Sequence, residues 1–72
     1  MDSEYLTKDQ IEIRILKLNS WIDSNPTNPM QGTAKKESMF YAFLLKDLKE
    51  WKMKRVKNTV PTQVYQQIGK LL

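Results

Sequence analysis

Two segments with helical periodicity flank a short stretch rich in proline and asparagine, and this arrangement restricts the chain to a helical hairpin. The separating stretch, residues 24–33, contains the steps Asn25-Pro26 and Asn28-Pro29. Because a residue that precedes proline avoids the helical conformation, one helix must end before this stretch and another must begin after it. The loop is long enough for the two helices to pack antiparallel.

The first segment predicts a helix over about residues 7–23. Thr7 and Gln10 have the spacing of a Thr-x-x-Gln capping box, which marks a helix start. Apolar residues then recur at the four-three-four spacing of one helix face, at Ile11, Ile15, Leu18 and Ile22. We expect this face to pack against the second helix.

The second segment predicts the longest helix, over about residues 34–57, with Thr33 as its cap. One broad apolar stripe runs along it, formed by Phe40, Tyr41, Leu44, Leu45, Leu48 and Trp51. The next position of this stripe is Arg55, which interrupts it. We therefore expect the last turns of this helix to extend beyond the core of the hairpin.

The segment Thr59-Val60-Pro61 predicts a new start, since proline is tolerated in the first turn of a helix but not in its interior. A short third helix is expected over about residues 60–71, with Val60, Val64, Ile68 and Leu71 on one face. No internal repeat or change in composition divides the chain. The fold class expected is all-α, a single small domain over residues 1–72 that consists of a long antiparallel helical hairpin and a short C-terminal helix.

Self-association is expected because a chain of 72 residues buries only a small core. Four apolar side chains point away from the seams that join the predicted helices, namely Ile13, Leu16, Phe43 and Met53. Several such residues on two adjacent helices indicate a further contact surface. A helical homo-oligomer follows, with burial of one of these surfaces under the third helix as the alternative.

Composition argues against catalysis and against a bound cofactor. The chain has no Cys and no His, so it lacks thiol nucleophiles, thiolate ligands, and the commonest general base and transition-metal ligand. The N-terminal residues do not have the pattern of a signal peptide, and the longest apolar run, residues 39–45, is too short to cross a bilayer. We expect a soluble, cytoplasmic protein that is not an enzyme and does not bind membranes.

Positive charge is concentrated in residues 46–57, which hold six basic and two acidic side chains, a surplus equal to the net charge of +4 of the whole chain. The basic residues are Lys46, Lys49, Lys52, Lys54, Arg55 and Lys57. A localised field of one sign attracts an anionic surface. An ordinary solvated helix face is the alternative interpretation, because lysine is common on such faces.

The start of the second helix offers a weaker candidate for anion binding, formed by Thr33, Lys35 and Lys36. Backbone N–H groups at a helix N-terminus attract phosphate. The stretch lacks the pattern of a phosphate-binding loop, so a simple Thr cap is the more economical interpretation.

These patterns predict a non-enzymatic regulator or inhibitor that binds a macromolecular partner stoichiometrically, with the basic segment meeting an acidic protein surface. The alternative is a nucleic-acid or nucleotide-binding protein that uses the same segment. In a helix-turn-helix version, Gln63, Gln66 and Gln67 would lie on the recognition helix. The size and simple patterning suit an accessory factor of the kind that phages and mobile elements encode.

Overall fold

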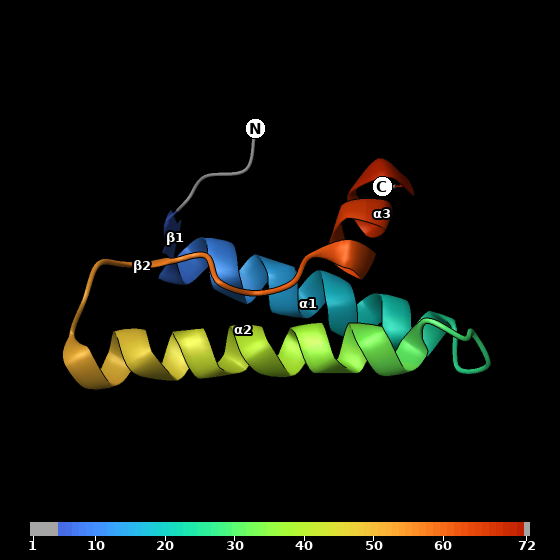
Figure 1. Ribbon diagram of the computed structural model, residues 1–72, viewed down its shortest axis with the longest axis horizontal. Helices are drawn as coiled ribbons and strands as arrows, with labels where there is room; N and C mark the ends of the chain where they lie inside the picture. Colours follow the sequence, from blue (N-terminus) through green and yellow to red (C-terminus); the bar gives the residue numbers. More distant parts are fainter. Residues whose placement is uncertain (1–4, 72) are drawn as a thin grey trace.

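The computed structural model describes the backbone of residues 5–71 and the side chains of residues 5–68. Figure 1 shows two long helices side by side, with a short strand pair at one end and a short helix that rises over the other end. In chain order the elements are β1 (Tyr5–Thr7), α1 (Lys8–Ser24), α2 (Gln31–Trp51), β2 (Arg55–Lys57) and α3 (Gln63–Leu71). The predicted helical hairpin and short C-terminal helix are confirmed.

The capping box at the start of α1 forms as predicted. The Thr7 hydroxyl accepts a hydrogen bond from the Gln10 backbone N–H at 3.3 Å, and the Gln10 side-chain oxygen accepts one from the Thr7 N–H at 2.9 Å. At the other end of the helix, the Asn25 side-chain amide donates to the Trp21 carbonyl at 2.8 Å. Both ends of α1 therefore have side-chain partners for backbone groups that a helix leaves free.

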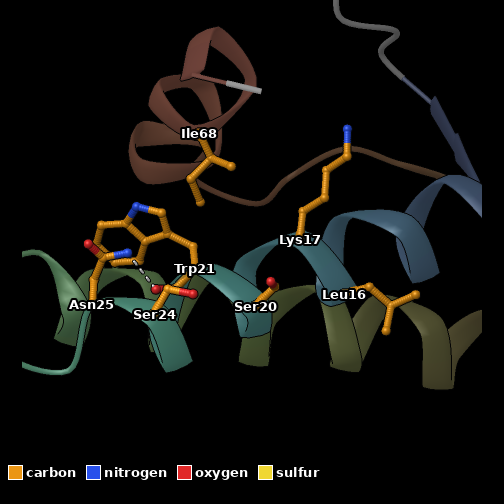
Figure 2. Close-up of a pocket in the computed structure, with 7 residues that line it drawn as sticks. All are labelled: Leu16, Lys17, Ser20, Trp21, Ser24, Asn25 and Ile68. Atoms are coloured by element: carbon orange, nitrogen blue, oxygen red, sulfur yellow. Dashed lines mark hydrogen bonds between the residues drawn. The ribbon is translucent and has the colours of Figure 1, made fainter.

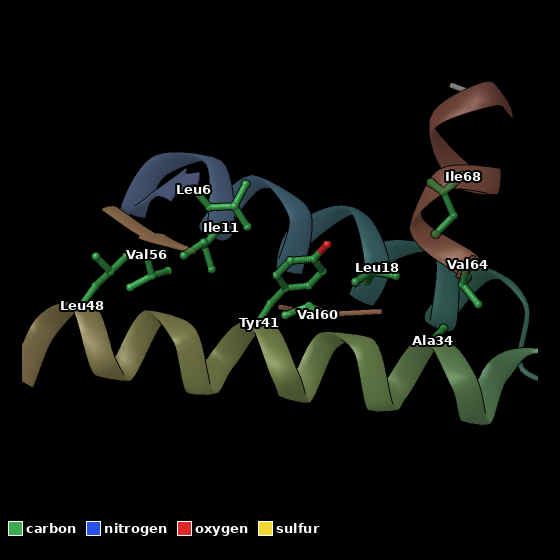
Figure 3. Packing of buried hydrophobic residues seen from close by; sticks show 10 residues of the cluster. All are labelled: Leu6, Ile11, Leu18, Ala34, Tyr41, Leu48, Val56, Val60, Val64 and Ile68. Atoms are coloured by element: carbon green, nitrogen blue, oxygen red, sulfur yellow. The ribbon is translucent and has the colours of Figure 1, made fainter. Parts of the chain in front are cut away.

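The hairpin core lies where α1 faces α2. Ile11 and Leu18 are buried on α1, and Ala34, Tyr41 and Leu48 are buried on α2 (Figure 3). Successive positions on each helix are seven residues apart, about two helical turns, so each set follows one side of its helix. The predicted stripe of α1 is confirmed at its centre, while Ile15 and Ile22 lie half-buried at its edge.

Two members of the predicted α2 stripe lie outside the core. Phe40 is 46% exposed and Trp51 is 71% exposed. The buried stripe instead passes through Ala34 and Glu37, which the apolar pattern did not include. The buried face of α2 is therefore turned toward Ala34 and away from Phe40.

Helix α2 ends at Trp51, so its predicted extension to residue 57 is wrong. Lys52 adopts a left-handed conformation, with φ of 51° and ψ of 35°, and the Met53 N–H donates to the Leu48 carbonyl at 3.1 Å. This closure of the last turn is a common way to end a helix, although glycine is the usual residue at such a position. The chain then turns back along the hairpin.

A two-stranded antiparallel sheet replaces the end of the predicted helix, and the expectation of a purely α-helical fold is therefore wrong. Strands β1 and β2 pair with Leu6 opposite Val56. Both of these side chains are buried, while their strand neighbours are exposed. Because side chains alternate between the two faces of a strand, one apolar pair of the sheet can cover the open end of the hairpin core. A helix over residues 52–57 would not place its side chains in this way.

Helix α3 begins at Gln63, three residues later than predicted, and packs against α1 and α2 of the same chain. Val60, Val64 and Ile68 are buried in the core, as expected, whereas the side chain of Leu71 lies outside the described residues. None of the helices within residues 5–71 is long and apolar enough to cross a membrane.

Candidate functional site

The six predicted basic residues do not share a helix. Lys46 and Lys49 lie on α2, Lys52 ends that helix, Lys54 lies in the following turn, and Arg55 and Lys57 belong to β2. All six are exposed. Lys46 forms an ion pair with Glu50 at 3.7 Å, one helical turn away, so part of the positive charge on α2 is neutralised locally.

Strand β2 presents its cations on one face. Arg55 and Lys57 are both exposed and flank the buried Val56, as alternation along a strand requires. The Arg55 guanidinium lies 5.0 Å from the centre of the Tyr5 ring on β1, a cation–π arrangement between diagonal neighbours of the sheet. The sequence had predicted that Arg55 interrupts the apolar stripe of the second helix. The structure places Arg55 on β2 instead, so this prediction is wrong.

Apolar side chains accompany these cations. Trp51 is the most exposed large apolar residue of those described, and Met53 is also exposed in the turn that follows. We call the exposed surface formed by Trp51, Lys52, Met53, Lys54, Arg55 and Lys57 the basic end. Sheet pairing and the closed last turn of α2 hold its backbone, so its charges are carried by ordered structure.

At the second predicted anion site, Thr33 does not cap α2 as the sequence predicted. Helix α2 begins at Gln31 rather than after Thr33, and its N-cap residue is Met30, without a side-chain cap. The Asn28 side-chain oxygen accepts a hydrogen bond from the Met30 N–H at 2.8 Å and orders this entry. Thr33 is therefore inside the helix, and Lys35 and Lys36 are exposed in its second turn, where a solvated lysine face accounts for them.

The four apolar residues predicted for association are exposed but do not form one surface. Ile13 and Leu16 lie on the side of α1 that points away from α2, since each is far around the helix from the buried Ile11 and Leu18. Phe43 is likewise far around α2 from the buried Tyr41, so it lies on the outer side of that helix. The structure therefore places them on opposite sides of the hairpin, with Met53 at the basic end.

A groove runs between α1 and α3 and has a volume of about 360 Å³. Figure 2 shows Trp21 and Asn25 at one end of it, Ile68 of α3 above it, and Lys17 extending on the α3 side of α1. Its lining residues are Leu16, Lys17, Ser20, Trp21, Ser24, Asn25 and Ile68. Leu16 also borders a second, shallower depression with Ile15 and Leu45, so it stands between two hollows.

The sequence interpretation missed a buried polar cluster, formed by Arg14, Glu37, Tyr41 and Tyr65. Glu37 is 1% exposed, and its carboxylate accepts hydrogen bonds from the backbone N–H groups of Val64 at 2.9 Å and Tyr65 at 3.1 Å. These are the second and third residues of α3, the N–H groups that a capping side chain ordinarily satisfies. Glu37 of α2 therefore caps α3 from another helix, where the helix dipole favours a negative charge.

Arg14 occupies the other half of this cluster. Its guanidinium donates a hydrogen bond to the Tyr41 hydroxyl at 2.8 Å and lies 4.7 Å from the centre of the Tyr65 ring. Burial raises the pKa of Tyr41 above its ordinary value of 10.0, although the hydrogen bond from Arg14 acts in the opposite direction. The cluster ties α1, α2 and α3 together.

A helix-turn-helix arrangement does not form. The residues before α3 belong to β2 and an irregular segment rather than to a preceding helix, although Gln63, Gln66 and Gln67 are exposed on α3 as that hypothesis required. Within residues 5–71 no group of three or more acidic side chains is placed to hold a metal ion. No protein family model matches the chain, and comparisons with curated proteins and with solved structures found no match.

Proposed function

We propose that this protein is a non-enzymatic binding module, a small regulator or inhibitor that acts by stoichiometric contact with an anionic surface of a macromolecular partner. The observation that supports this proposal is the basic end, where Lys52, Lys54, Arg55 and Lys57 are all exposed on an ordered turn and strand. A fixed group of like charges steers a partner of opposite charge and orients it on arrival.

An acidic protein surface is the favoured partner because of the side chains that accompany the charges. Trp51 and Met53 are exposed and precede Arg55 by only a few residues in the chain, and Trp, Met and Arg are residue types enriched in protein interfaces. Large apolar side chains of this kind supply binding free energy when a partner covers them, whereas the surrounding lysines contribute mainly to the association rate.

Nucleic-acid binding is the second candidate, and the exposure of Trp51 favours it over a purely electrostatic contact. An exposed indole next to Lys52 and Lys54 can stack on an unpaired base while the lysines contact phosphates. Duplex recognition is less favoured, since Lys52, Lys54, Arg55 and Lys57 lie on a turn and a strand rather than on a helix that could enter a groove.

Two triple variants with the same change in net charge test the proposal. One variant reverses the basic end with Lys52→Glu, Lys54→Glu and Lys57→Glu, and the control reverses exposed lysines elsewhere with Lys8→Glu, Lys35→Glu and Lys36→Glu. The measurements are quantitative affinity capture from the native host lysate, with and without nuclease, and binding of dye-labelled single-stranded and duplex oligonucleotides over a range of salt concentrations.

We expect the basic-end variant to lose a protein partner that the control variant retains, with no effect of nuclease. Capture that nuclease abolishes, together with oligonucleotide binding that weakens steeply with salt, would support the second candidate instead. If both variants capture the same partners as the parent, the basic end is a solvated surface and the proposal is wrong.

A further inference from the structure

The outer face of α1 carries two apolar side chains at seam spacing, and both are exposed within the part of the chain that the structure describes. Ile13 is 50% exposed and Leu16 is 69% exposed, and both point away from α2. Together with Asp9 and Ser20 they follow a four-three-four spacing, which keeps them on one narrow stripe. In heptad terms Ile13 occupies an a position and Leu16 the following d position, the combination that favours two strands rather than three or four within parallel coiled coils.

The charges beside this stripe are complementary. Glu12 precedes Ile13 at a g position and Lys17 follows Leu16 at an e position, so one borders each side of the seam. In a parallel pair, a g residue of one helix faces the e residue five positions later in the other helix. Two copies of α1 would therefore place each Glu12 opposite Lys17 of the other copy, twice per pair.

The groove between α1 and α3 offers a hollow for side chains of a second helix. It borders the seam on the Lys17 side, and Trp21 and Ile68 form its apolar walls (Figure 2). On the Glu12 side, the depression next to Ile15 and Leu45 continues the contact surface. A helix laid along the stripe would cover apolar surface on both flanks as well as in the seam itself.

The outer face of α2 is the competing surface, and its charges do not favour self-pairing. Met39 and Phe43 are exposed there at seam spacing. The corresponding flanking positions are Ala42 and Asp47, which offer no attraction between two copies. Complementary flanking charges are thus a feature of the outer face of α1 and not of the outer face of α2.

We infer that two copies of this chain associate through the outer faces of α1, in parallel, with Ile13 and Leu16 in the seam and Glu12 facing Lys17 of the second copy. This inference does not rest on the proposed function. Parallel pairing sets both basic ends at the same end of the dimer, so a partner with two anionic sites would be bound more tightly than a single site.

The first test compares two substitutions of similar character on opposite faces. Light scattering after size exclusion, at up to about 100 μM protein, detects dimers with micromolar dissociation constants. We expect a dimer for the parent chain and for Phe43→Lys, and a monomer for Leu16→Lys with unchanged helical circular dichroism. A monomeric parent, or dissociation by Phe43→Lys and not by Leu16→Lys, would overturn the inference.

The second test determines the orientation from charge reversal. Glu12→Lys and Lys17→Glu should each weaken self-association by at least about fivefold, because each replaces attraction with repulsion at two contacts. An equal mixture of these two variants should form a mixed dimer with affinity close to that of the parent, measured by energy transfer between chains labelled at the N-terminus. Self-association that neither variant weakens, or a mixture that does not recover, would exclude parallel pairing through α1.

Discussion

Charged side chains occupy two contrasting regions of this molecule, the interior beneath α3 and the basic end. In the interior, Glu37 and Arg14 have named partners within hydrogen-bond distance. At the basic end, Lys52, Lys54 and Lys57 are exposed on a turn and a strand. The comparison shows that the same kind of residue can determine the fold in one place and remain available for a partner in another.

The physical basis of this contrast is solvation. A buried carboxylate loses its hydration and must recover that loss through hydrogen bonds, so removing any member of its network leaves groups that water cannot reach. An exposed lysine keeps its hydration, and replacing it changes the stability of the fold very little. Substitutions in the two regions should therefore differ strongly in their effect on stability.

The largest effect is expected for Glu37→Ala. This change removes the acceptor for two N–H groups at the start of α3, and we expect it to lower the free energy of unfolding by about 3 kcal/mol, most of what so small a domain possesses. Urea denaturation measures the loss, and hydrogen exchange at Val64 and Tyr65 should show that α3 opens first.

The matched control is Glu50→Ala on the same helix, where the carboxylate is exposed and pairs with the exposed Lys46. It should change the free energy of unfolding by less than about 0.5 kcal/mol. Equal losses for the two variants would show that Glu37 does not cap α3, and the contrast between the two regions would fail.

An intermediate effect is expected for Tyr41→Phe. The variant removes the hydroxyl that accepts a hydrogen bond from buried Arg14, which should cost about 1–2 kcal/mol in denaturation experiments at neutral pH. The apolar ring itself is retained, so the loss reports on the hydrogen bond rather than on the packing of the core.

The same variant gives a prediction for alkaline pH. Because the pKa of Tyr41 is raised in the folded state, the folded protein binds more protons than the unfolded chain above pH 10.0. Stability should therefore fall as the pH rises from the ordinary tyrosine pKa through the raised one, and Tyr41→Phe should lose less stability over that interval. An identical alkaline decline in the parent and the variant would contradict this assignment.

The smallest effect is expected at the boundary between the two regions, for Arg55→Ala. Loss of the contact with Tyr5 should lower the free energy of unfolding by about 0.5–1 kcal/mol, whereas Lys57→Ala on the same strand face should have no measurable effect. Thermal unfolding of both variants checks this difference. Truncation of a large core residue typically costs at least about 2 kcal/mol. A loss above that value for Arg55→Ala would therefore place Arg55 with the interior residues.

The helices were predictable because their signals are local. The capping box at Thr7 and Gln10 and the proline steps at Pro26 and Pro29 act within a few residues, and they fixed the limits of α1 closely. The end of α2 was not predictable in this way. Lys52 carries no sequence signal for a left-handed conformation, and β2 forms only because β1, fifty residues earlier, offers Leu6 as a partner for Val56.

The same distinction between local signals and long-range contacts applies to the candidate site. The sequence by itself determined that Lys46 and Lys49 would be exposed on their helix and that Ile13, Leu16 and Phe43 would lie outside the hairpin seam, since helical periodicity assigns these faces. The other four cations of residues 46–57 lie on a turn and a strand, which that periodicity did not predict. Only the tertiary structure decided that Ile13 and Phe43 lie on opposite sides and that Arg55 rests on Tyr5. Glu37 and Arg14 had the right spacing for burial, but a charged residue is buried only where distant groups hydrogen-bond to it, and those groups are brought together by folding.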